Sequence, residues 1–151
     1  MLSSKGLALL FIFFLVSPHL YTQSQGNTTG ADPLSFVGFT LNDLVSRFGT
    51  PRSVYPARGL EEWQDDVVFA YGQGDFYIHR DRVWQLSLRA IRGINIGDSR
   101  SVVSLVLGST AETRGNSIFY PINDRSWPLM LRCDFDNAGR VQAIFIYRAD
   151  F

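Results

Sequence analysis

The 151-residue sequence predicts an α+β fold made of two tandem copies of a helix followed by antiparallel strands. A glycine interval recurs, because Gly38–Gly49 and Gly97–Gly108 each bracket ten residues and lie 59 positions apart. The dipeptide Arg-Val also recurs, at positions 82–83 and 140–141. We expect the two helices to pack on one face of the sheet and to leave its other face open. The expected copies are residues 36–92 and 93–151.

Each copy opens with a short helix that has clear start and stop signals. Thr40 is a natural N-cap, and Asp43 stands three residues later, where it completes a capping box. Gly49 accepts the left-handed conformation that ends a helix. Ser99 and Gly108 are the corresponding start and stop in the second copy. The apolar residues expected to face the sheet are Leu41, Leu44, Val45 and Phe48 in the first helix and Val102, Val103, Val106 and Leu107 in the second.

Short apolar runs separated by turn residues follow each helix and predict strands. In the first copy these are residues 62–64, 67–71, 75–79 and 82–89, and in the second copy 117–120, 129–135 and 140–148. The segment 136–139 reads as a hairpin turn in which Gly139 takes a positive φ, and Arg80-Asp81 reads as its tighter counterpart. Apart from the short run 62–64, the expected order is therefore helix, strand, strand, strand, twice over.

The first 24 residues have the pattern of a secretory signal peptide. Lys5 precedes an unbroken apolar run, Gly6–Val16, that is too short to span a bilayer as a helix. Thr22 and Ser24 are small residues at the −3 and −1 positions, so cleavage after Ser24 is expected, and an uncleaved N-terminal anchor is the alternative. No cysteine lies near this site, so a lipoprotein anchor is excluded. Residues 25–35 are polar and predict a flexible lead-in. We therefore expect a periplasmic or secreted protein.

The composition argues against several kinds of partner and chemistry. Fourteen basic residues balance fourteen acidic ones, which disfavours nucleic-acid binding. Cys133 is the only cysteine, and its strand position predicts a buried, inert thiol. Neither a zinc set nor a spaced calcium loop can be assembled, so we expect no metal and no cofactor. His79 near Asp81 could be a general base, but hairpin charges are usually solvated, and we expect no enzyme activity.

Strand alternation separates a core face from an open face. Ile144 and Ile146 correspond to Leu86 and Leu88, so this set is assigned to the core. The residues then expected on the open face, where a protein partner would bind, are Tyr77, His79, Arg132, Phe145 and Tyr147. Aromatic residues and arginine are the types that dominate binding hot spots. The alternative is that these side chains pack on one another or on loops, and a slip of one residue would exchange the two faces.

The segment Gly38–Pro51, with Thr40, Asp43, Leu44, Phe48 and Gly49 at fixed spacing, resembles the opening motif of small outer-membrane-assembly lipoproteins of the SmpA/OmlA (BamE) type. A duplicated version of such a module is similar to beta-lactamase inhibitor protein, and the resemblance covers about residues 36–147. The second copy departs from the pattern, since Thr110 stands where a proline would repeat. The resemblance implies a binding module of the bacterial cell envelope that docks a partner on its exposed sheet face.

The sequence thus predicts an exported protein-interaction module, either an envelope assembly or scaffold factor or an enzyme inhibitor. The alternative from a different class is a small-molecule or lipid-binding periplasmic protein that uses a cleft between the two copies. An association with the membrane would be peripheral.

Overall fold

A computed structural model describes residues 31–59, 65–123 and 126–150 of the chain. The expected signal peptide, its cleavage site and the expected strand at 62–64 lie outside these residues. Among the described residues, neither helix has the length and apolar character needed to cross a membrane. The helical elements are η1 (Pro33–Phe36), α1 (Leu41–Phe48), α2 (Arg100–Leu107) and η3 (Gly108–Thr110). The strands are β1 (Ser53–Ala57), β2 (Asp66–Ala70), β3 (Gly74–His79), β4 (Arg82–Leu88), β5 (Ala90–Ile91), β6 (Ile94–Asn95), β7 (Glu112–Arg114), β8 (Ser117–Ile122), β9 (Leu129–Phe135) and β10 (Val141–Arg148).

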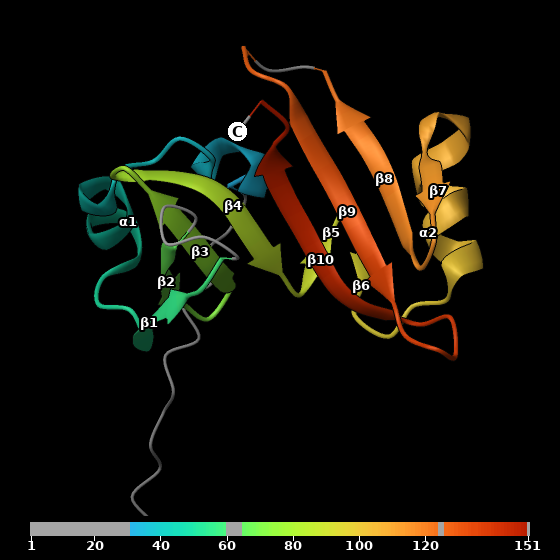
Figure 1. Ribbon diagram of the computed structural model, residues 1–151, viewed down its shortest axis with the longest axis horizontal. Helices are drawn as coiled ribbons and strands as arrows, with labels where there is room; N and C mark the ends of the chain where they lie inside the picture. The colour runs from blue at the N-terminus through green and yellow to red at the C-terminus, as the bar shows by residue number, and fades with distance from the viewer. Residues whose placement is uncertain (1–30, 60–64, 124–125, 151) are drawn as a thin grey trace, which may run out of the picture.

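Eight of these strands form one antiparallel sheet in the order β1-β2-β3-β4-β10-β9-β8-β7. Strands β4 and β10 lie at its centre and pair with each other, from Ile144 opposite Leu88 to Tyr147 opposite Gln85. The short strands β5 and β6 pair separately. Figure 1 shows a strongly bent sheet, with α1 flanking the first four strands and α2 flanking the last strands at the other end.

The predicted fold class is wrong. Of the described residues, 47% lie in strands and 20% in helices, and a large antiparallel sheet replaces the expected pair of helix-plus-three-strand units. The prediction missed β1 and β7, the two edge strands, because neither shows an apolar-polar alternation. Their residues are almost all exposed, so burial placed no pattern on their sequences. The prediction also overestimated the share of the fold that the helices form, since each has only eight residues.

The predicted helix caps are confirmed. Thr40 Oγ1 accepts a hydrogen bond from the Asp43 N–H at 3.1 Å, and Asp43 Oδ2 accepts one from the Thr40 N–H at 2.8 Å. These bonds hold the pKa of the Asp43 carboxyl below its ordinary value. Ser99 Oγ accepts only a longer bond, 3.4 Å, from the Val102 N–H. Both helices end at a glycine with a φ of 73°, Gly49 and Gly108, a conformation that a side chain would strain.

The predicted helix faces are only partly buried. Leu44 of α1 and Val103 and Leu107 of α2 join the core, but Val45 and Val106 remain 45% and 43% exposed. Helices of two turns cover too little of the bent sheet to bury a full apolar stripe. Much of the packing under α1 is instead aromatic. The ring of Phe36 from η1 lies 5.1 Å from that of Phe48, and the Phe48 ring lies 5.4 Å from that of Phe76.

The core occupies one face of the sheet. Leu86 and Leu88 of β4 and Ile144 and Ile146 of β10 are buried, as the alternation predicted. Cys133 is fully buried beside them, and burial raises the pKa of its thiol to about 11, which confirms the predicted buried cysteine. Other core residues on β3, β4, β8, β9 and β10 are Phe76, Ile78, Val83, Ile118, Ile122, Leu129, Leu131, Phe135 and Val141.

The segment before each helix is tied to a central strand by the same set of bonds. The Gly38 N–H donates to the Val83 carbonyl, and the Val83 N–H donates to the carbonyl of Phe39, just before α1. The Gly97 N–H likewise donates to Val141, whose own N–H donates to Asp98, just before α2. Two guanidinium groups complete the sets: Arg82 donates to the Gly38 carbonyl and Arg140 donates to the Gly97 carbonyl, each at 3.1 Å. The recurring Arg-Val dipeptide therefore marks the points where β4 and β10 anchor a helix start.

The two caps give a paired test of helix stabilisation. We expect Thr40→Ala to lower the free energy of unfolding by about 1 kcal/mol, because it removes the bond that Thr40 Oγ1 accepts from the Asp43 N–H and the bond that this hydroxyl donates to Asp43 Oδ2. Ser99→Ala should cost less than half of that, since its single capping bond is long. Urea unfolding followed by far-ultraviolet circular dichroism measures both values. Equal losses in the two variants would contradict this account of the caps.

Candidate functional site

The structure brings four of the expected face residues together on the side of the sheet opposite the core. Phe145 of β10 lies directly across from Arg132 of β9. Tyr147 pairs with Gln85 of β4, which in turn pairs with Tyr77 of β3. Directly opposed residues on neighbouring strands share a face, so these side chains form one surface across the centre of the sheet. We call Tyr77, Arg132, Phe145 and Tyr147 the central patch.

The fifth expected residue, His79, lies at the end of β3 beside a different carboxylate from the one considered in the sequence. Its Nδ1 is 3.5 Å from Oδ1 of Asp66, on the neighbouring strand β2. Arg80 and Asp81 form the tight turn to β4, with φ values of 47° and 63°. The nearness of His79 and Asp81 in the sequence thus did not identify the acid that His79 contacts. The pairing of β2 with β3 places Asp66 beside His79.

Asp66 is the centre of a small buried polar cluster on the same side of the sheet. Its side chain is 9% exposed, and its Oδ2 accepts a hydrogen bond from the Trp84 indole N–H at 3.0 Å. Burial raises the pKa of the Asp66 carboxyl, while the bond from Trp84 and the nearby His79 act in the opposite direction. Val68, two residues along β2, is fully buried. The side of the sheet opposite the core is therefore not open at the β2 end, contrary to the expectation of an open face.

Trp84 reaches this cluster because β4 carries a bulge. Tyr77 pairs with Gln85 and Ile78 pairs with Val83, so Trp84 is an extra residue with no partner on β3. A bulge redirects a side chain relative to simple alternation. Alternation from Leu86 and Leu88 would place Trp84 in the core, so the contact of Trp84 with Asp66 could not be predicted from the sequence.

On the other side of the central patch, Arg132 is held by an acid and an aromatic ring. Its Nε lies 3.1 Å from Oδ1 of Asp134 in an ion pair, although the angle is not that of a hydrogen bond. Asp134 Oδ1 also accepts a bond of 2.6 Å from the Ser117 hydroxyl. The guanidinium carbon lies 4.5 Å from the centre of the Phe145 ring, within cation–π range. Arg132 is thus fixed across the patch.

Tyrosines on the same side lie in a partly desolvated and acidic environment. Burial, followed by the charges of Asp75 and Asp66, raises the pKa of Tyr77, and Arg132 opposes the shift. At the edge, the Tyr55 hydroxyl donates to Asp75 at 3.1 Å, and burial together with that bond raises the pKa of Tyr55 to about 12. Both phenols therefore stay neutral donors at physiological pH. Tyr55 lies on β1, an edge strand that the sequence did not reveal.

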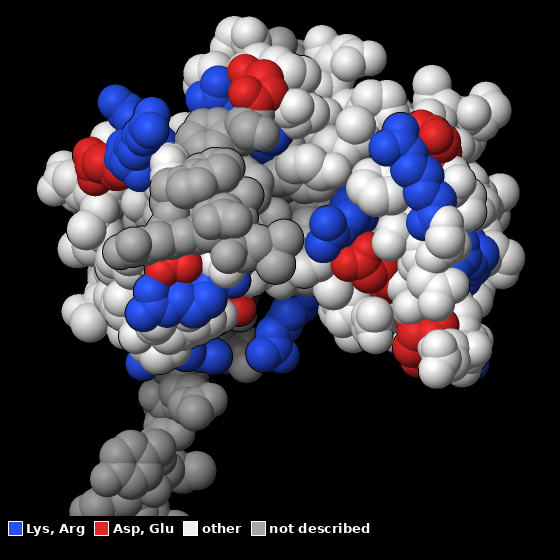
Figure 2. Space-filling model, viewed as in Figure 1, with Lys and Arg blue, Asp and Glu red and all other residues white. Residues whose placement is uncertain are grey.

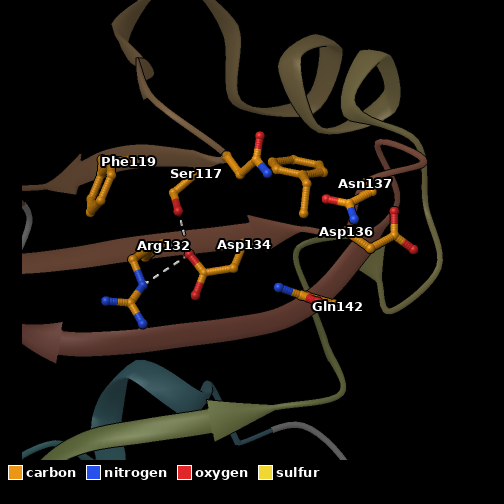
Figure 3. A pocket seen from close by; sticks show the side chains of 9 residues that line it. Ser117, Phe119, Arg132, Asp134, Asp136, Asn137 and Gln142 are labelled. Atoms are coloured by element: carbon orange, nitrogen blue, oxygen red, sulfur yellow. Dashed lines mark hydrogen bonds and ion pairs between the residues drawn. The ribbon is translucent and has the colours of Figure 1, made fainter.

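A hollow of about 470 Å³ opens at the hairpin end of β8, β9 and β10, next to Arg132 (Figure 3). Its lining is mainly polar and comes from the turn before β8, from β8 and β9, and from the β9–β10 hairpin. A second hollow of about 480 Å³ lies at one end of the β4–β10 seam, and Asp75, Ser87 and Gln142 contribute to it. The direct pairing of β4 with β10 makes the sheet continuous, and residues of both halves line this second hollow.

Charge on the visible side of the molecule is mixed. Figure 2 shows arginine and acidic side chains interspersed over the surface, without a large area of one sign. The equal numbers of basic and acidic residues in the chain agree with this distribution. Within the described ranges, no group of three histidine, cysteine, aspartate or glutamate residues is arranged to hold a metal ion. The chemistry that the central patch offers is aromatic and guanidinium contact.

No protein-family model matches the sequence, and no curated protein matches it. The structure is similar to that of an extracellular protein containing an SCP domain from Bacillus anthracis str. Ames, with a TM-score of 0.52 and 13% identity. The likeness covers 85% of this chain and 49% of that protein, so the chain spans about half of its length. A DUF4309 family protein from Bacillus subtilis subsp. subtilis str. 168 is also similar, at a TM-score of 0.46 and 17% identity, over 72% of this chain and 78% of that protein.

The likeness to the Bacillus anthracis structure is one of fold alone. Neither solved structure is an outer-membrane-assembly lipoprotein or a beta-lactamase inhibitor protein. The resemblance drawn from residues 38–51 therefore stays a prediction.

The buried Asp66 gives a test by pH. Its raised pKa means that the folded state keeps a proton at pH values where the unfolded chain, with a pKa near 3.8, has lost it. Its contribution to stability therefore falls as the pH rises from that value through the folded pKa. The Asp66→Asn variant has no carboxyl to ionise, and its amide oxygen can still accept from Trp84. In a pH series that begins below 3.8, we expect the variant to gain stability relative to the wild type as the pH rises through the raised pKa of the folded state.

The neighbouring Asp65 is the matched control. A bond from Arg58 holds the pKa of the Asp65 carboxyl below its ordinary value. Asp65→Asn should therefore lose stability relative to the wild type over the same pH series, measured by urea unfolding. A parallel response in the two variants would contradict the burial of Asp66.

Proposed function

We propose that this protein is an exported protein-interaction module that binds a protein partner through the central patch. An envelope assembly or scaffold factor and an enzyme inhibitor are two forms of this function. The observation that carries the proposal is the common position of Tyr77, Phe145 and Tyr147 around Arg132, on the side of the sheet away from the core.

The residue types of the patch support this function energetically. Tyrosine and arginine are enriched in binding hot spots, and a tyrosine buries a large area at a low cost in rotamer entropy. Arg132 is already held by Asp134 and Phe145, so little further ordering is needed when a partner docks. The tyrosines keep their protons and can donate hydrogen bonds across an interface.

Export is part of the same proposal. The apolar run Gly6–Val16 after Lys5 has the composition of a signal peptide, with cleavage near Ser24. The extracellular character of the Bacillus anthracis protein is consistent with this location.

A lipid-binding function has less support from the geometry. Sites for small apolar ligands are lined mostly by apolar and aromatic side chains. The hollow that both halves of the chain line, at one end of the β4–β10 pair, has polar and charged groups such as Asp75, Arg89 and Asn95 in its lining. Native mass spectrometry of the purified protein tests this alternative, since a bound lipid would remain as a mass shift.

The partner proposal is tested by crosslinking and pull-down from the native envelope, with the full chain as bait. We expect Tyr77→Ala and Tyr147→Ala each to reduce capture of the crosslinked partner at least about tenfold, as hot-spot residues do. Phe145→Ala should act similarly, because it also removes the ring that supports Arg132. Urea unfolding of each variant must show a cooperative transition.

The matched control is Leu105→Ala on α2, which removes a large apolar side chain that is 84% exposed and distant from the patch. This variant should capture the partner as the wild type does. Capture that survives in the patch variants, or that fails equally in the control, would show that the patch is not the binding surface.

A further inference from the structure

The hollow at the hairpin end of β8–β10 has chemistry that the central patch does not use. Its volume, about 470 Å³, falls in the range of sites for small ligands. It shares only Arg132 with the central patch. Its shape comes from three neighbouring strands and two turns, which are rigid supports for a site.

Three side-chain amides line this hollow from three different segments. Asn116 lies in the turn before β8, Asn137 in the β9–β10 hairpin, and Gln142 near the start of β10. Within the described part of the chain, none of the three amides is bonded to another side chain or to the backbone. Each amide therefore offers both a donor and an acceptor to a ligand.

A bulge directs Gln142 to this place. Val141 pairs with Phe135 and Ala143 pairs with Asp134, so Gln142 is an extra residue on β10. Bulges are over-represented beside functional sites, where they re-aim a side chain. Figure 3 shows the Gln142 side chain extending toward Asp134 at one end of the hollow.

The charged groups of the hollow already have partners within the protein. Asp134 is paired with Arg132 and bonded by Ser117. Asp136 Oδ1 accepts bonds from the N–H groups of Ala138 and Arg140, at 2.9 and 2.8 Å. A phosphate would meet two carboxylates, and a cation would meet the Arg132 guanidinium. The hollow therefore suits a neutral polar ligand.

An aromatic ring completes the lining. Phe119 of β8 lies directly opposite Arg132, and Figure 3 places its ring at the end of the hollow away from Asn137 and Gln142. A sugar ring has a face of C–H groups that packs on an aromatic ring, and its hydroxyls each donate and accept a hydrogen bond. Amides, a paired carboxylate and one aromatic ring together match that surface.

We propose that this hollow binds a short neutral oligosaccharide. The Asn137 and Gln142 amides would bond the sugar hydroxyls, and the face of the Phe119 ring that the Arg114 guanidinium does not cover would pack on the sugar ring. This site is separate from the protein-binding function proposed for the central patch, and it does not depend on that function.

The test is titration of the full chain with neutral trisaccharides of glucose, galactose, mannose and N-acetylglucosamine, followed by ligand-detected nuclear magnetic resonance. We expect at least one of them to bind at about 10 mM or below, a weak but measurable affinity. Asn137→Ala and Gln142→Ala should each weaken that binding about tenfold, the effect of one lost hydrogen bond. Phe119→Leu keeps apolar volume without the ring and should also weaken it.

Asn42→Ala is the matched control, because Asn42 is an exposed amide on α1, away from the hollow. It should bind the trisaccharide as the wild type does. The proposal is overturned if none of the four trisaccharides binds, or if Asn137→Ala and Gln142→Ala bind as tightly as Asn42→Ala. Partner capture by the Asn137→Ala and Gln142→Ala variants should stay unchanged, so failure here is distinct from failure of the central patch.

Discussion

The pairing of β4 with β10 is the contact on which the rest of the structure depends. It joins two groups of strands that are distant in sequence into one sheet, through opposed residues such as Leu86 with Ile146 and Leu88 with Ile144. These four side chains are buried, so separating the strands would expose a large apolar area as well as break the ladder. The same pairing puts Phe145 and Tyr147 of β10 beside β4 and brings Tyr77 of β3 within one strand of them. The central patch, with residues from β3, β9 and β10, exists only because β4 pairs with β10.

The sequence predicted those parts of the fold whose signals are local. Thr40 with Asp43, and Ser99, define helix starts through side chains that bond their own backbone a few residues away. The period-two burial of β9 and β10 likewise shows in their residues. The fold class was wrong because edge strands are stabilised by pairing alone. β1 packs no apolar face against the core, so its residues are free of the pattern that would identify a strand.

The candidate site could likewise be predicted only where its residues follow the regular alternation of a strand. Tyr77, Arg132, Phe145 and Tyr147 follow regular alternation on strands that also contribute to the core, so their common face could be deduced from the core residues. Asp66 and Trp84 could not be placed in this way. Asp66 is an acid in a position where burial is rare, and it is tolerated because Trp84 donates to one of its oxygens and His79 lies near the other. That arrangement requires a tertiary contact and a bulge, neither of which has a signature in a single sequence.

The bulges at Trp84 and Gln142 each come directly after a valine that bonds the segment before a helix. Val83 and Val141 each bond the segment before a helix, through the N–H and the carbonyl, while they begin a strand of the sheet. Immediately afterwards one extra residue occurs, Trp84 in β4 and Gln142 in β10, and regular pairing resumes beyond it. The backbone bonds to the segment before the helix thus interrupt the regular pairing of β4 with β3 and of β10 with β9. The extra residue lets this pairing continue beyond that point. Each correction turns a side chain to the face away from the core: Trp84 toward Asp66, and Gln142 toward the hollow beside Asp134. Anchoring of the helices and the placement of these polar sites are therefore consequences of one backbone arrangement, and a change that loosened the anchor at Val141 would move Gln142 as well.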